Sequence, residues 1–442
     1  MSDAMTPRVF LFLQGPSSSI FMKIATRLEQ LGHRCLRINL NAGDQIFWRG
    51  KGATHYRGRG GDDWSRFVTT FIRDNRVTDL VLLGEERDYH RIAVEAARHA
   101  GVSIYVVEMG YLRPDWLTLE RDGMSSNSHF PADPQQILDA AQTLPEPDWK
   151  RRYSQTFVAD AGLDLLYNLP NVFLWFLYPH FRRHALFHPL AEYAGWIVRL
   201  LRAGSRSRQA EAVIEETVAG AAPFFVFPLQ LQTDFQLRAH SPYNDQREAI
   251  DTVIGSFAHA APADARLIVK VHPLDNGLID WRSYVDRRAG DAGVATRLDY
   301  VDGGNLDHLL DHAAGTVTVN STVGLHALQR CKPVKVLGAA VFDIDGLTHQ
   351  GPLDGFWTAP HQPDPALAQS FFRLMAAAIQ VRGNFYSKAG TDAGAAAIAQ
   401  RLHELTVNEP GGFIDPPPRA RPEKLIAASR YPIRRKDTAD GR

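Results

Sequence analysis

The feature that most constrains the fold is the alternation of short, continuous apolar segments with amphipathic ones. In the N-terminal part, the apolar segments predict strands and the segments between them have helical periodicity. The predicted strands are 8–13, 34–38, 78–83 and 103–107, and the predicted helices are 20–31, 63–74 and 89–99. Continuous apolar strands are buried on both faces, so this pattern predicts a parallel sheet covered by helices.

The same alternation returns in the second half of the chain. Its predicted strands are 224–227, 266–271, 316–319 and 334–337, and its predicted helices are 243–258 and 323–329. A chain of 442 residues is too long for one core, so we expect two α/β domains. By analogy of architecture, this predicts two Rossmann-like domains facing across a cleft, as in GT-B enzymes.

The domain boundaries follow from changes in composition. We expect an N-terminal Rossmann-like domain at 1–150, a helical insertion at 151–215, and a C-terminal Rossmann-like domain at 221–400. The residues from 415 to 442 form a Pro-rich, basic tail.

Composition narrows the class of protein. The formal net charge is zero, so no global charge argues for nucleic acid as a partner. The two cysteines, Cys35 and Cys331, are expected to be reduced. No signal peptide and no apolar run of about 20 residues is visible. We therefore expect a cytoplasmic protein that contacts a membrane only peripherally.

Polar side chains follow several of the predicted strands. Asp234 comes after the strand at 224–227, and His272-Pro273 follows the strand at 266–271. Glu108 follows the strand at 103–107. Ligands of open α/β sheets bind beyond the carboxyl ends of the strands, so these residues are candidates for an active site.

A fourth cluster, Asn320-Ser321-Thr322, joins the strand at 316–319 to a short helix. Free backbone N–H groups at a helix start favour an anion, and a nucleotide phosphate is the natural candidate. We expect these three residues, with His272 and Pro273, to bind that nucleotide, as the donor substrate of the protein.

Each candidate also has an ordinary structural interpretation. Asp234 and the hydroxyls of 321–322 could cap helices. His272 could be a structural histidine, and Glu108 could pair with Arg113. The histidines and cysteines lack metal-ligand spacing, so no metal site is expected. No G-x-G-x-x-G follows a strand, which disfavours a dehydrogenase.

The segment 165–208 has a different character, with many aromatics, six arginines and one acid. Such a stretch predicts interfacial helices that touch anionic lipid. The residues expected at this surface are Trp175, Arg182, Arg183, Trp196 and Arg199. The alternative is a buried helical insertion with a solvated basic edge.

Several motifs, taken in order, carry a family resemblance. They are EMGYLRPDWLTLE at 108–120, LQTDFQLRAHSPY at 231–243, KVHPLDNG at 270–277, VNSTVGLHAL at 319–328 and GNFY at 383–386. Together they resemble the capsule polysaccharide biosynthesis and export family, and within it the KpsS/LipB type. The resemblance covers the chain from about 8 to 390 and fades in the tail.

The resemblance implies a β-Kdo glycosyltransferase at the inner membrane. Such proteins move Kdo from CMP-Kdo onto a phosphatidylglycerol lipid and so begin the capsule linker. A KpsC-like transferase and capsule export machinery are the implied partners, and no cofactor is needed beyond the donor. Two alternatives stay open, namely a non-catalytic export or assembly component and a transferase of another CMP-ulosonic acid.

The resemblance also implies roles for single residues. Asp234 matches the candidate nucleophile, while the His-Pro motif falls on His272 and the Ser/Thr motif on Ser321. These place the donor in the C-terminal domain and the acceptor in the N-terminal one. The family's acidic-Gly motif carries two acids, and here Met109 holds the second position. We expect Glu108 to be the required acid, acting as the base.

Overall fold

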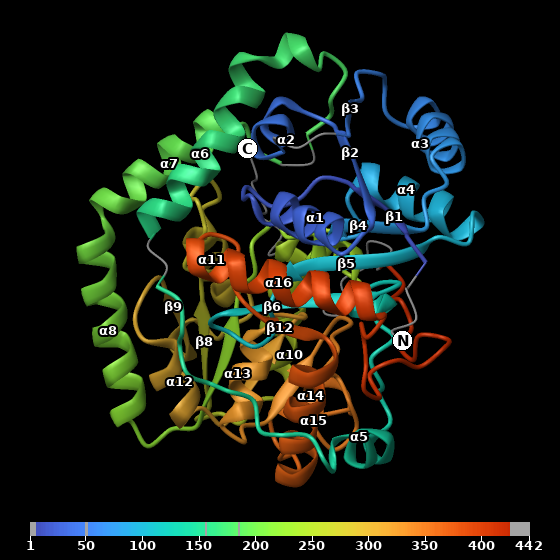
Figure 1. The fold of residues 1–442 in the computed structure, drawn as a ribbon. Coiled ribbons are helices and arrows are strands. Elements are labelled where there is room, and N and C mark those ends of the chain that lie inside the picture. Colours follow the sequence, from blue (N-terminus) through green and yellow to red (C-terminus); the bar gives the residue numbers. More distant parts are fainter. Residues whose placement is uncertain (1–5, 49–51, 155–156, 184–185, 425–442) are drawn as a thin grey trace. The chain divides into compact units, whose positions relative to one another are not determined.

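The computed structural model describes residues 6–48, 52–154, 157–183 and 186–424. The chain divides into two compact units, each described separately below (Figure 1). Unit 1 comprises Met1–Pro131, Gln136–Pro189 and Ser370–Arg419, and unit 2 comprises Ala132–Gln135, Leu190–Gln369 and Ala420–Arg442. Most of the predicted basic tail, from 425 to 442, lies outside the described residues.

Unit 1 is built on a seven-stranded sheet. Its strands are β1 (Val9–Phe12), β2 (Arg34–Asn39), β3 (Ala53–His55), β4 (Asp79–Leu83), β5 (Ser103–Met109), β6 (Trp116–Arg121) and β12 (Gln380–Arg382). Its helices are α1 (Ile20–Gln30), α2 (Ala42–Phe47), α3 (Asp62–Asp74), α4 (Asp88–His99), η1 (Ser125–Asn127), α5 (Pro134–Ala141), α6 (Phe157–Phe173), η2 (Trp175–Leu177), α15 (Pro365–Ala378) and α16 (Lys388–Glu404), of which α5 and α15 begin in unit 2.

The strands of this sheet lie in the order β12-β6-β5-β4-β1-β2-β3. Strands β1 to β5 are parallel, while β6 runs antiparallel to both of its neighbours. Alternate residues point to opposite faces of a strand. Phe10 and Phe12 therefore pack in one apolar cluster with α1 and α16, and Leu11 and Leu13 pack in another with α3 and α4.

The C-terminal segment returns to this sheet, which differs from the predicted boundary at residue 400. Strand β12 pairs with β6, with Val381 opposite Leu117, and α16 packs along α1. Residues 370–419 consequently complete the core of unit 1. A three-residue strand carries too little periodicity to be recognised before its partner is known.

Unit 2 is built on a five-stranded sheet. Its strands are β7 (Phe224–Pro228), β8 (Arg266–Lys270), β9 (Leu298–Val301), β10 (Gly315–Thr318) and β11 (Val334–Val336). Its helices are α7 (Pro189–Leu201, from Leu190 on), α8 (Ala203–Ala219), α9 (Phe235–Ala239), α10 (Gln246–Ala260), α11 (Trp281–Asp291), η3 (Ala295–Arg297), α12 (Leu306–His312), α13 (Val323–Gln329) and α14 (Leu353–Phe356).

All strands of the second sheet are parallel, in the order β11-β10-β7-β8-β9. One face buries Phe225 and Phe227 beneath α10 and α11, and the other buries Phe224 and Val226 beneath α8 and α12. Each fully buried side chain of this size contributes about 1.5–3 kcal/mol to folding.

Two Rossmann-like α/β units were predicted, and both sheets with their helical covers confirm this class of fold. The predicted helical insertion at 151–215, however, is not one separate element. Helix α6 belongs to unit 1, whereas α8 covers a face of the sheet in unit 2 through Ala210 and Ile214. Among the described residues, no helix combines the length and apolar character needed to cross a bilayer.

Glu85 and Glu120 are among the carboxyl groups buried in unit 1. Oε1 of Glu85 accepts hydrogen bonds from the backbone N–H of Met124 (2.9 Å) and the amide of Asn127 (3.2 Å). Glu120 accepts from the hydroxyls of Ser128 and Tyr111. Burial raises the pKa of Glu85 to about 7 and that of Glu120 to about 8.

These raised values predict a pH-dependent stability. A glutamate in the unfolded chain has a pKa of about 4.3, so between that value and about 8 the folded state holds more protons than the unfolded state. The free energy of unfolding should therefore fall as pH rises from 5 to 8, by up to about 1.4 kcal/mol per pH unit for each of the two glutamates.

Glu120→Gln, which stays neutral, should give a flatter profile in denaturant titrations across this range. The exposed Glu95 of α4 offers a matched control, Glu95→Gln, whose profile should follow that of the unaltered protein. A Glu120→Gln profile parallel to that of the control would show that Glu120 is ionised in the folded state.

Candidate functional site

The candidate donor residues share one edge of the sheet in unit 2. Strands β10, β7 and β8 are consecutive in that sheet and parallel, so their carboxyl ends meet at the same edge. Ser321 follows β10, Asp234 follows β7 and His272 follows β8. The structure thus brings together three clusters that are far apart in the sequence. His272 lies 38 residues after Asp234 (272 − 234), and Ser321 lies 49 residues after His272 (321 − 272).

Asp234 caps a short helix at this edge. Its Oδ1 accepts a hydrogen bond from the backbone N–H of Gln236 (2.8 Å) at the start of α9. Helix capping was one of the two roles expected for Asp234, and this hydrogen bond confirms it. The same bond fixes the orientation of the carboxylate, which is half-buried.

His272 is held in one tautomer by its own loop. The backbone N–H of Leu274 donates to Nδ1 of His272 (3.0 Å), so Nδ1 carries no proton. The neutral ring then has its proton on Nε2, which is a hydrogen-bond donor. His272 is half-buried and Pro273 is exposed.

Asn320 ties the loops of this edge together. Its Oδ1 accepts from the amide of Gln230 (2.8 Å), and its Nδ2 donates to the carbonyls of Gln236 (2.8 Å) and His240 (3.3 Å). Its side chain is therefore engaged in positioning the loop after β7. We assign Asn320 a positioning role, and the donor contact expected from the sequence stays a prediction.

The adjacent hydroxyls lie at the start of α13. Oγ of Ser321 accepts from the backbone N–H of Val323 (3.3 Å), and the backbone N–H of Ser321 donates to the hydroxyl of Thr318 (3.1 Å). Thr322 is the residue before the helix, and its side chain forms no capping hydrogen bond. Both residues are half-buried.

An arginine cluster that the sequence did not reveal holds the same edge. Arg199 binds Asp302, which follows β9, through two hydrogen bonds of 2.8 and 3.2 Å, and lies 3.8 Å from Asp275. Arg206 binds the same carboxylate of Asp302 (2.7 Å). Asp275 in turn accepts from the indole N–H of Trp281 (3.1 Å), which orders the loop after His272.

This network corrects the expectation that Arg199 faces a lipid surface. Its side chain is only 12% exposed and is paired inside unit 2. A pairing with an acid 103 residues later in the chain cannot be read from local composition.

Glu108 occupies the corresponding edge of unit 1, near the end of β5. Its Oε1 accepts from the backbone N–H of Met109 (3.0 Å). Met109 is exposed, so the residue that replaces the second acid faces away from the core. Gly110 donates its N–H to the carbonyl of Trp116 (2.9 Å), and a Cβ on Gly110 would lie 2.3 Å from that oxygen. Only glycine allows the backbone at position 110 to come this close to the carbonyl of Trp116.

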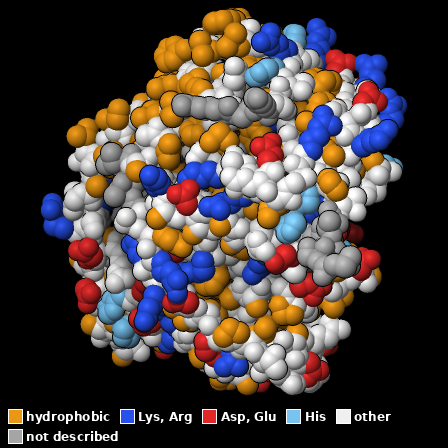
Figure 2. Space-filling view, in the orientation of Figure 1, with side chains coloured by type: hydrophobic (Ala, Val, Ile, Leu, Met, Phe, Trp, Pro, Cys, Tyr) orange, Lys and Arg blue, Asp and Glu red, His pale blue; other side chains and the backbone are white. Residues whose placement is uncertain are grey.

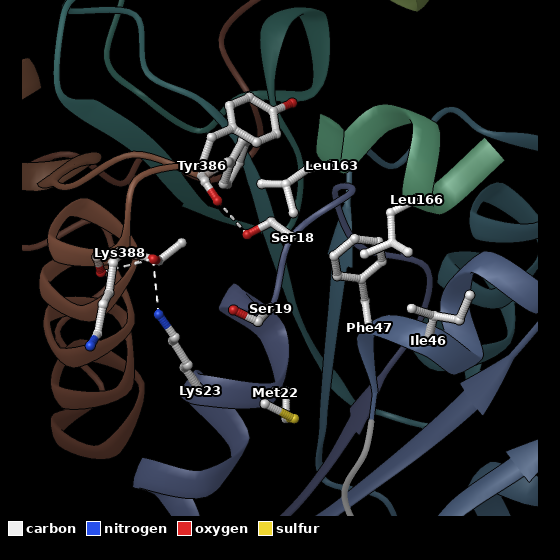
Figure 3. Close-up of a pocket in the computed structure, with 12 residues that line it drawn as sticks. Ser18, Ser19, Met22, Lys23, Ile46, Phe47, Leu163, Leu166, Tyr386 and Lys388 are labelled. Atoms are coloured by element: carbon white, nitrogen blue, oxygen red, sulfur yellow. Dashed lines mark hydrogen bonds between the residues drawn. The ribbon is translucent and has the colours of Figure 1, made fainter. Parts of the chain in front are cut away.

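Unit 1 also contains a pocket of about 380 Å³ (Figure 3). It lies between the start of α1, α2, α6 and the start of α16. Its lining residues are Ser18, Ser19, Met22, Lys23, Ile46, Phe47, Leu163, Leu166, Phe385, Tyr386, Lys388 and Thr391. Two segments of the sequence meet here, the turn that precedes α1 and the GNFY motif at 383–386.

The residues expected at a membrane surface differ in their exposure. Hydrophobic side chains gather over α6 and η2 (Figure 2), where Phe173, Trp175 and Phe176 are each about 60% exposed. Arg182 is exposed as well. Arg183 is half-buried and donates to Asn168 (3.2 Å), and Trp196 of α7 is half-buried.

Comparison of the sequence with known proteins gives extensive matches. The capsule polysaccharide biosynthesis protein family matches residues 78–386. The capsule polysaccharide export protein KpsS of Escherichia coli is 31% identical over 378 residues, which cover 85% of this chain and 96% of that protein. The capsule polysaccharide modification protein LipB of Neisseria meningitidis serogroup A is 32% identical over 387 residues, covering 86% and 91%.

Comparison with solved structures gives a match to the β-Kdo 2,7 transferase KpsC of Thermosulfurimonas dismutans. It aligns with 90% of this chain and 99% of its own, at 14% sequence identity and a TM-score of 0.45.

The role of Asn320 can be tested by truncation. Asn320→Ala leaves Gln230 and the carbonyl of Gln236 without these partners, which should lower the free energy of unfolding by about 1–3 kcal/mol. Under the function that we propose below, it should also weaken CMP binding, because the loop after β7 loses its anchor.

Denaturant unfolding and CMP titration measure the two effects. Asn244→Ala, at an exposed position of the same unit, is the control and should change stability by no more than about 0.5 kcal/mol. Equal behaviour of the two variants would contradict the positioning role.

Proposed function

This chain belongs to the capsule polysaccharide biosynthesis protein family, and we propose that within it the chain acts as a glycosyltransferase. The donor would be CMP-Kdo, and the reaction would form a β-linkage with retention of configuration. The observation that carries this proposal is the convergence of Asp234, His272 and Ser321 at three neighbouring strand ends. That edge offers a carboxylate, an N–H donor and hydroxyls within one unit.

The first step would form a bond between Asp234 and the donor sugar. Its carboxylate attacks the anomeric carbon as the bond from that carbon to the CMP oxygen breaks, and CMP departs with the electron pair. The helix cap holds the carboxylate in place before the attack. Nε2–H of His272 and the hydroxyls of Ser321 and Thr322 would donate hydrogen bonds to the departing phosphate.

The second step would transfer the sugar to the acceptor. Glu108 takes the proton of an acceptor hydroxyl, whose oxygen attacks the anomeric carbon, and the Asp234 carboxylate is released. Two inversions give net retention. The scheme assigns every proton and electron pair to the donor, the acceptor or these side chains, so it calls for no metal ion.

The acceptor would be a phosphatidylglycerol lipid at the inner membrane. The exposed aromatic side chains of α6 and η2, with Arg182, support contact with an anionic lipid surface. A KpsC-like transferase would then extend the product, and capsule export machinery would receive it. The names of the relatives, an export protein and modification proteins, support a capsule role without specifying the reaction.

The reaction can be tested with purified protein, CMP-Kdo and a short-chain phosphatidylglycerol, with the product detected by mass spectrometry. Asp234→Asn keeps an oxygen that can cap α9 but removes the nucleophile, so activity should fall by on the order of 10⁴-fold or more. Asp234→Ala should in addition lower stability by about 0.5–2 kcal/mol, because the cap is lost.

Asp234→Asn that is stable and fully active would reject the nucleophile assignment. An unaltered protein that binds CMP but yields no product with CMP-Kdo would favour another CMP-ulosonic acid or a non-catalytic role in export. CMP-sialic acid supplied as the donor in the same assay separates those two outcomes, because a transferase of that sugar yields a product and a non-catalytic protein does not.

Membrane contact generates a separate prediction. The triple variant Trp175→Ser, Phe176→Ser and Arg182→Glu should bind vesicles containing phosphatidylglycerol at least about tenfold more weakly, since it removes both apolar area and charge. Activity on a soluble short-chain acceptor should be retained.

Vesicle co-sedimentation measures this loss. The control is Arg91→Glu, at an exposed position on α4 of the same unit, which should leave vesicle binding unchanged. Unchanged binding by the triple variant, or an equal loss in the control, would count against a specific lipid surface.

A further inference from the structure

We propose that the pocket of unit 1 binds the glycerophosphate head and upper acyl chains of an anionic phospholipid. This inference rests on the proposed function, because the bound lipid would be the acceptor. The pocket combines a cationic wall, an apolar wall and an exposed apolar segment that begins beside it.

The cationic wall comes from α1 and α16. Lys23 donates to the hydroxyl of Thr391 (2.9 Å) and forms an ion pair with Asp392 (2.9 Å). Lys388 is exposed and forms no ion pair within the described part of the chain. Lys23 is engaged by Asp392, so Lys388 is the lysine of this wall that can bind the single negative charge of a phosphodiester.

The apolar wall lies opposite the lysines (Figure 3). It consists of Ile46 and Phe47 from the end of α2 and of Leu163 and Leu166 from α6. A phosphate ion or a free nucleotide would gain nothing from this wall, whereas acyl chains would bury apolar area against it.

The size of the pocket also favours a lipid that is only partly enclosed. Its volume of about 380 Å³ is near the lower end of the range for small-ligand pockets, about 300–1,000 Å³. Two long acyl chains do not fit inside, so they must leave along α6. Leu165 and Leu166 are partly exposed on that helix, and Phe173 to Phe176 continue the apolar surface.

The pocket is linked electrostatically to the proposed base. Tyr386 lines the pocket, and burial raises the pKa of its phenol to about 12, with the negative charges of Asp160, Asp164 and Glu108 acting in the same direction. Glu108 is therefore close enough to influence a lining residue. Ser18 follows β1 and Glu108 lies near the end of β5, and the carboxyl ends of these two parallel strands lie on the same edge of the sheet. A lipid held in the pocket would present its head-group hydroxyl towards this edge.

The test is equilibrium binding of dihexanoyl phosphatidylglycerol, below its micelle concentration, to the full-length protein. Lys388→Glu should weaken binding about tenfold, since it reverses a charge that faces the phosphate. Leu166→Asp should weaken it by a similar factor. Lys388 is exposed in the first turn of α16, where an acid is compatible with the helix, so this variant should fold normally.

Lys150→Glu, at an exposed position of unit 1 outside the pocket, is the charge control and should bind as the unaltered protein does. Glycerol 3-phosphate and dihexanoylglycerol, which lack the chains or the phosphate, should each bind far more weakly than the lipid. Glycerol 3-phosphate binding as tightly as the lipid would overturn the lipid assignment in favour of a free phosphate site. Unaltered lipid binding by both pocket variants would refute the assignment of lipid binding to this pocket.

CMP titration of the same samples separates this inference from the proposed function. If the protein binds CMP and transfers Kdo, but all variants bind the lipid equally well, the proposed function stands and lipid binding in the pocket is refuted. If the lipid binds in the predicted manner, but nothing is transferred from CMP-Kdo, lipid binding in the pocket stands and the proposed function is refuted.

Discussion

The parallel pairing of β10, β7 and β8 is the constraint on which the candidate donor site depends. Because the three strands run in one direction, the residues that follow them are delivered to one edge whatever their separation in sequence. The loops there are then fixed by specific bonds, from Asn320 to the loop after β7 and from Asp302 to Arg199. Chemistry at this edge therefore relies on ordered loops rather than on the sheet alone.

Structural and catalytic interpretations of the same residue need not compete. Asp234 caps α9 through Oδ1, and the bond that satisfies the helix also orients the carboxylate. His272 likewise accepts a backbone N–H within its own loop, and that bond leaves the proton on Nε2. In both cases a local hydrogen bond holds the side chain in an arrangement suited to the proposed reaction.

Much of the fold could be predicted from sequence, because its central strands are continuous apolar runs. The predicted strand at 103–107 and the predicted helix at 323–329 correspond to β5 and α13. What escaped prediction depends on distant partners. Strand β12 is recognised only by its pairing with β6. The sequence alone assigns Arg199 to a basic surface, because its partner Asp302 is distant in the chain. The pocket of unit 1 also escaped prediction, because α1 and α16, which both line it, are more than 300 residues apart in the sequence.

The proposed mechanism requires a covalent bond between Asp234 and the donor sugar. The most direct measurement is peptide mass mapping of the protein after incubation with CMP-Kdo in the absence of acceptor. We expect a Kdo ester on the peptide that contains Asp234, and we expect it to disappear when phosphatidylglycerol is added. A protein that transfers Kdo while the adduct forms on another residue, or that gives a product of inverted configuration, would contradict the account.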